Sequence, residues 1–128
     1  MAATLTVALI SDVFYTADGP DRLRARLREA SERGAELAVL PEIPLNPWSP
    51  ATSHARDEDA EPPEGPRQRV LAAAAHDERV AIVGGAIIRD PGTGIRHNTA
   101  LVYDGRGQLV ASYRKVHLPD EDGFHEPA

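Results

Sequence analysis

The first forty residues constrain the fold most, because their apolar pattern changes from strand to helix and back. Residues 4–10 are rich in β-forming side chains and predict a buried strand. A helix is predicted to begin near Pro20 and to stop at Gly34. Its apolar residues recur at helical spacing, at Leu23, Leu27 and Ala30. Residues 37–40 then form a short apolar run that Pro41 ends, so we expect two parallel strands joined by a helix.

The rest of the chain continues the pattern with a loop, one helix and three strands. Seven prolines between residues 41 and 66, together with the acidic residues from 57 to 64, predict a long, irregular and solvated loop. A helix is predicted from Pro66 to about residue 78, followed by strands at 80–88, 98–103 and 108–114 that glycine-rich turns separate. This order predicts an α/β fold whose mixed sheet is parallel early, antiparallel late and covered by helices on one face.

Charge and composition exclude several classes of function. The 128 residues carry a formal net charge of -6 and no basic block, which argues against a nucleic-acid partner. No apolar run approaches the roughly 20 residues that span a bilayer, and the N-terminus lacks the pattern of a signal peptide, so we expect a cytoplasmic protein with no membrane partner. The sequence contains no cysteine, which excludes disulfides, thiolate metal sites and a cysteine nucleophile among these residues.

Two charged residues stand directly after predicted strands, where α/β proteins place their sites. Glu42 follows the second strand and Lys115 follows the last one. A carboxylate there can act as a general base, and an ammonium group can stabilise an oxyanion. Taken singly, each is more often an ordinary solvated side chain.

A series of short motifs resembles the nitrilase superfamily of carbon-nitrogen hydrolases. The motifs follow the opening strand and helix and occur in the family's order, as Leu40-Pro41-Glu42, Gly84-Gly85, Asn98-Thr99-Ala100, Asp104-Gly105 and Tyr113-Arg114-Lys115-Val116-His117-Leu118. The resemblance covers nearly the whole chain, so that residues 1–128 are expected to form one C-terminally incomplete domain. It implies the N-terminal half of the family's α-β-β-α sandwich and a homo-oligomer.

The resemblance also implies a mechanism and a set of site residues. The family's catalytic glutamate and lysine correspond to Glu42 and Lys115, and a second glutamate, eleven positions after the lysine, corresponds to Glu126. The histidine two positions after the lysine, here His117, is expected to support the site. The family's nucleophilic cysteine lies beyond the lysine, past residue 128. The implied substrate is a small amide, carbamoyl-amine or nitrile, with amides favoured and without a cofactor or a metal.

Several features keep alternatives open. Trp48 either lines the substrate pocket or anchors the long loop to the core. The paired glycines 84 and 85 are better explained by close backbone packing than by a phosphate loop, since no glycine-rich phosphate motif is present. The lack of cysteine leaves room for a non-catalytic binding or assembly module that retains the first half of the fold. A Rossmann-like nucleotide binder is the weakest alternative, because the first strand lacks that fingerprint.

Overall fold

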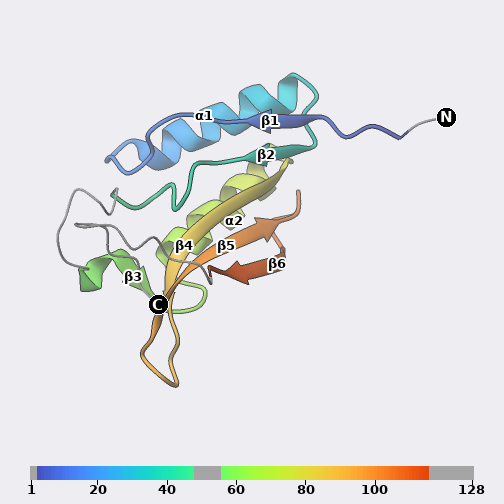
Figure 1. The fold of residues 1–128 in the computed structure, drawn as a ribbon. Coiled ribbons are helices and arrows are strands. Elements are labelled where there is room, and N and C mark those ends of the chain that lie inside the picture. The colour runs from blue at the N-terminus through green and yellow to red at the C-terminus, as the bar shows by residue number, and fades with distance from the viewer. Residues whose placement is uncertain (1–2, 48–55, 116–128) are drawn as a thin grey trace.

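A six-stranded mixed sheet is the centre of the computed structural model, which describes residues 3–47 and 56–115 (Figure 1). Five strands follow one another in the order β1-β2-β4-β5-β6, and β3 pairs with β4 off this path. The parallel part contains β1 (Val7–Leu9), β2 (Leu37–Val39) and the first residues of β4 (Ala81–Arg89). Antiparallel pairing then adds β5 (Arg96–Tyr103) and β6 (Leu109–Arg114). The expected change from parallel to antiparallel pairing is confirmed.

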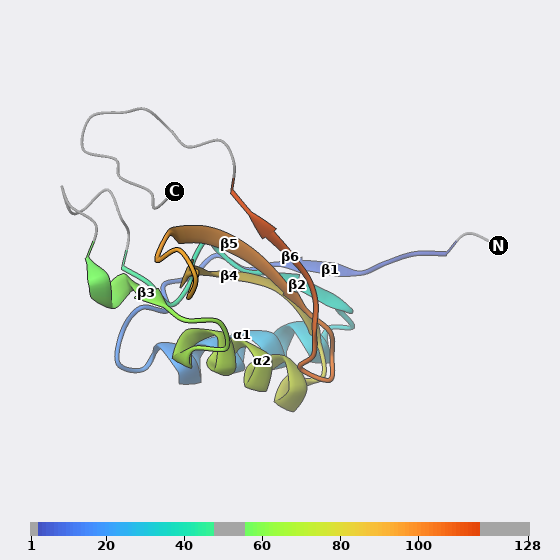
Figure 2. The same cartoon turned by 90° about the horizontal axis from the view of Figure 1, so that it is seen from below.

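Both helices lie on the same face of this sheet (Figure 2). The first, α1 (Gly19–Glu32), buries the apolar stripe expected from its spacing, and Gly34 follows it with a φ of 87°, which glycine adopts without strain. The second, α2 (Pro66–Glu78), buries Leu71, Ala74 and Ala75. Proline stands in the first turn of each helix, where its missing N–H has no partner to lose.

The core lies between these helices and the sheet. Its largest fully buried side chains come from the helices, the sheet and the segment between β1 and α1, and include Phe14, Leu23, Leu27, Leu71, Ile82 and Leu101. The opposite face of the sheet has no covering layer among the described residues (Figure 2). On β1, for example, Ala8 packs against the core, whereas Leu9 is 82% exposed. Side chains alternate across a strand, so the same alternation that builds the core also leaves apolar side chains on the open face.

The first strand is shorter than predicted. Residues 4–10 were expected to be extended, yet β1 pairs only over Val7–Leu9. It lies at the edge of the sheet and pairs with β2 alone, whose own ladder covers Leu37–Val39. A strand with a single partner can form regular pairs only over that partner's length.

The prediction of a wholly solvated acidic loop is wrong at Glu61. Asp57–Asp59 forms a single 3-10 turn, and β3 (Ala60–Glu61) pairs in parallel with Ile87 and Ile88 of β4. Glu61 is only 4% exposed. Its carboxylate accepts hydrogen bonds from the backbone N–H groups of Arg67 and Gln68 at 3.1 Å, in the first turn of α2. Burial of this charge is therefore compensated by the helix end that it caps.

No helix within residues 3–47 and 56–115 combines the length and apolar character that a membrane span requires.

Candidate active site

Glu42 stands just beyond the carboxyl end of β2, in the middle of the parallel part of the sheet. Leu40 continues the strand by donating its N–H to the carbonyl of Val83 at 3.0 Å. This distance is typical of a hydrogen bond between paired strands. The chain then turns sharply, because Ile43 has a φ of 35°. A β-branched residue avoids this region, so the turn is locally strained and is held by its buried surroundings.

Lys115 reaches the same place from the other end of the described chain. It follows β6 directly, and its backbone N–H donates to the carbonyl of Asn98 at 2.9 Å. Its Nζ lies 3.3 Å from Oε1 of Glu42. The structure thus brings together two charged side chains that are 73 positions apart in the sequence.

Asn98 is a third polar contact of the site. It lies on β5, is 7% exposed, and donates from Nδ2 to Oε1 of Glu42 at 2.8 Å. The sequence interpretation used Asn98 only as part of a family motif and assigned it no role of its own. The alternation of side chains along the strand could have indicated its position. Thr99 and Leu101 point toward the helices, so Asn98 points to the opposite face of the sheet.

A cavity of about 330 Å³ opens beside these three residues. Its walls are largely apolar and come from the residues after β2, from inner residues of β4 and β5, and from the end of β6. They include Leu40, Val83, Gly84, Gly85, Ala100 and Tyr113. A side chain at position 85 would bring its Cβ within 2.9 Å of the carbonyl oxygen of Thr99, so glycine is required for this close approach of β4 to β5. The expectation of close backbone packing beside the site agrees with this contact.

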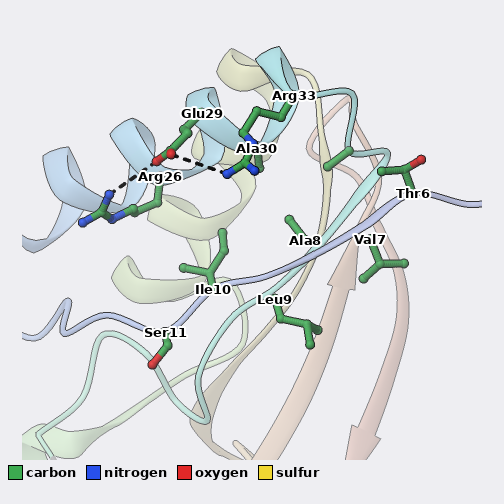
Figure 3. Close-up of a pocket in the computed structure, with 11 residues that line it drawn as sticks. Thr6, Val7, Ala8, Leu9, Ile10, Ser11, Arg26, Glu29, Ala30 and Arg33 are labelled. Atoms are coloured by element: carbon green, nitrogen blue, oxygen red, sulfur yellow. Dashed lines mark hydrogen bonds and ion pairs between the residues drawn. The ribbon is translucent and has the colours of Figure 1, made fainter.

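A second and larger cavity, of about 480 Å³, lies between the edge strand β1 and helix α1 (Figure 3). Its charged residues pair with one another, since Glu29 lies 3.4 Å from Arg26 and 3.9 Å from Arg33. None of the predicted site residues lines it. The smaller cavity is therefore the candidate active site, because it alone of the two joins a carboxylate to a cation at the ends of strands.

Three predicted site residues fall outside the described part of the chain. These are Trp48, His117 and Glu126. Their expected roles as pocket wall, supporting histidine and second glutamate stay predictions. Among residues 3–47 and 56–115, no group of three or more histidine or carboxylate side chains is arranged to hold a metal ion.

The geometry suits proton transfer next to a developing negative charge. Glu42 is 60% exposed, so its carboxylate is accessible from the cavity, and Lys115 places a positive charge beside it. A carboxylate can accept and return a proton, and an ammonium group can stabilise an oxyanion.

Comparison with known proteins gives the same family on independent grounds. The family model for carbon-nitrogen hydrolases matches residues 14–128. The human protein named omega-amidase NIT2 is 32% identical over 105 residues, which cover 82% of this chain and 37% of that protein. The curated relatives are much longer, and the chain spans between 26% and 41% of their length.

Solved structures show the same fold. The crystal structure of an amidase from Nesterenkonia sp. superposes with a TM-score of 0.69 and 25% identity, covering 93% of this chain and 45% of that one. A variant of the Nesterenkonia sp. AN1 amidase in complex with acrylamide superposes with a TM-score of 0.68 and 22% identity, covering 97% and 48%. The expected nitrilase-type fold is confirmed, and the chain belongs to the carbon-nitrogen hydrolase family.

Proposed function

We propose that these residues supply the general base and the oxyanion-stabilising cation of a hydrolase that cleaves the carbon–nitrogen bond of small amides. The observation that carries the proposal is the 3.3 Å contact between Glu42 and Lys115 beside a cavity. Because the two residues are so far apart in the sequence, their contact depends on the tertiary fold. The amidases among the relatives favour an amide over a carbamoyl-amine or a nitrile as substrate.

The roles follow from the chemistry of the two side chains. The 128 residues hold no cysteine, so the attacking thiol comes from outside them. Glu42 accepts the thiol proton, and the sulfur forms a bond to the amide carbon. The carbonyl oxygen becomes negative next to Lys115. Glu42 then gives its proton to the nitrogen, the carbon–nitrogen bond breaks, and ammonia or an amine leaves behind a thioester.

Water completes the cycle. Glu42 takes a proton from the attacking water, whose oxygen forms a bond to the thioester carbon, and Lys115 again faces the negative oxygen. The carbon–sulfur bond breaks, the proton on Glu42 returns to the sulfur, and a carboxylic acid is released. A cavity of about 330 Å³ with apolar walls suits a small substrate.

The test measures ammonia release from a panel of simple amides, carbamoyl-amines and nitriles. It compares the 128-residue chain with a polypeptide continued through the following coding sequence. We expect activity only in the extended form, and we expect Glu42→Gln and Lys115→Ala each to lower kcat/KM by about 10² to 10⁴-fold. Glu58→Gln is the matched control, because it neutralises an exposed carboxylate that does not line the cavity.

The outcomes separate the two classes of function. Wild-type rates in Glu42→Gln and Lys115→Ala would overturn the assignment of the catalytic pair. An extended polypeptide without activity on any of the three substrate classes would favour a non-catalytic binding or assembly module. Gel filtration of the extended form tests the expected homo-oligomer, and cell fractionation tests the expected cytoplasmic location.

A further inference from the structure

Asn98 contacts both members of the catalytic pair, by different groups. Its side-chain Nδ2 donates to Glu42 Oε1 at 2.8 Å, and its backbone carbonyl accepts the N–H of Lys115 at 2.9 Å. One residue of β5 therefore connects the loop after β2 to the end of β6.

The side chain of Glu42 needs such a partner. It is 60% exposed, so packing restricts its rotamers little, and a free glutamate side chain samples several of them. The ion pair with Lys115 is longer, at 3.3 Å, and a solvent-exposed pair orders its partners weakly. The hydrogen bond from Asn98 is shorter and comes from a side chain that is 7% exposed. The hydrogen bond from Asn98 therefore restricts the position of the Glu42 carboxylate more than the ion pair with Lys115 does.

The surrounding backbone holds Asn98 itself in place. Asn98 pairs with Ile87 in the antiparallel ladder between β4 and β5. Its neighbour Thr99 is buried, and its carbonyl oxygen lies so near Gly85 that a Cβ there would come within 2.9 Å of it. The donor group therefore belongs to the most extensively paired part of the sheet, whereas Glu42 belongs to a strained turn at Ile43.

We propose that Asn98 is a positioning residue that holds the Glu42 carboxylate against the Lys115 ammonium group and fixes the point at which Lys115 leaves the sheet. This inference rests on the proposed function and deepens it. Asn98 does not exchange protons or touch the reacting atoms. It narrows the range of positions that the base and the cation adopt before the reaction begins.

The first test uses kinetics of the extended polypeptide. Asn98→Ala removes the donor and keeps the backbone contact, and Asn98→Asp replaces the donor with a second carboxylate of the same shape. We expect both variants to lower kcat by about 10- to 100-fold while KM changes less than about threefold, since misplacement of a reacting group impairs the chemical step more than binding. Leu101→Val is the control, because it weakens the packing of the same strand without touching Glu42.

The second test does not depend on activity. In the extended polypeptide, the NMR signals of the Asn98 side-chain amide should shift in Glu42→Ala and stay in place in the control Glu58→Ala. Unmoved amide signals would overturn the contact, whether or not the extended form is active. A kcat in Asn98→Ala equal to that of Leu101→Val, with Glu42→Gln still impaired, would overturn the positioning role alone and leave the proposed function standing.

Discussion

Tyr103 ends β5 in the core of the protein, and its pKa departs strongly from the ordinary value. Burial raises its pKa to about 12, and the negative charge of Glu61 adds to the effect. The ordinary pKa is 10.0, so the folded protein retains the phenolic proton at pH values where the unfolded chain has lost it. Between these two values the unfolded state binds fewer protons, and stability falls as the pH rises.

This difference can be measured as a free energy of unfolding. Between pH 9.5 and pH 12 we expect the protein to lose roughly 2 kcal/mol more stability than Tyr103→Phe, which has no proton to release. Urea denaturation followed by circular dichroism at several pH values would show it. Tyr113→Phe is the control, because it makes the same substitution at a side chain that is 61% exposed. If the wild type and Tyr103→Phe lost the same stability over this pH range, the raised pKa of Tyr103 would be contradicted.

At the scale of single residues, the sequence was sufficient to select Glu42 and Lys115 as candidates, whose side chains the structure brings within 3.3 Å, but it was insufficient for Asn98. The first two are charged residues that follow strand ends within recognisable motifs. The role of Asn98 depends on its side chain reaching a carboxylate 56 positions away, which requires the register of β5 against β4 and the course of the turn after β2. A motif shows that a residue belongs to a family pattern, but it does not identify the atom that the residue contacts.

At the scale of elements, periodicity predicted both helices and the later strands, and it failed where a short segment is held by tertiary contacts. The starts of α1 and α2 follow from Pro20 and Pro66, and β6 agrees with prediction within one residue at its start. The two-residue strand β3 has no periodicity that a sequence could reveal. It exists because it pairs with β4 and because Glu61 caps α2.

The capping contact makes a prediction about stability. Glu61 accepts hydrogen bonds from the backbone N–H groups of Arg67 and Gln68 and from the side-chain amide of Gln68. Glu61→Ala leaves these donors without their acceptor in a buried place, so we expect a loss of about 2–3 kcal/mol in the free energy of unfolding. The control Glu58→Ala removes an exposed carboxylate and should cost less than about 0.5 kcal/mol. Similar denaturation curves for the two variants would show that Glu61 does not cap α2.

At the scale of the whole molecule, the arrangement of layers decides how these 128 residues behave alone. Helices cover one face of the sheet (Figure 2). The other face presents Val7, Leu9 and Tyr113 to water. The edge strand β1 also has only one partner. Apolar faces and unpaired edges of this kind promote association. The sequence predicted this open face, because a sheet with helices on a single side has apolar residues left over on the other.

The open face gives a test of whether the 128 residues form a complete fold. We expect the isolated chain to bind a hydrophobic dye and to associate at micromolar concentrations, and we expect Leu9→Lys to reduce both, since it places a charge at the most exposed apolar position of that face. Ala25→Lys adds the same charge to an exposed position of α1, on the covered side, and should reduce neither. Dye fluorescence and sedimentation velocity measure the two effects. A monomer that binds no dye and melts cooperatively would show instead that the sheet needs no second layer, and would contradict the expectation of an incomplete domain.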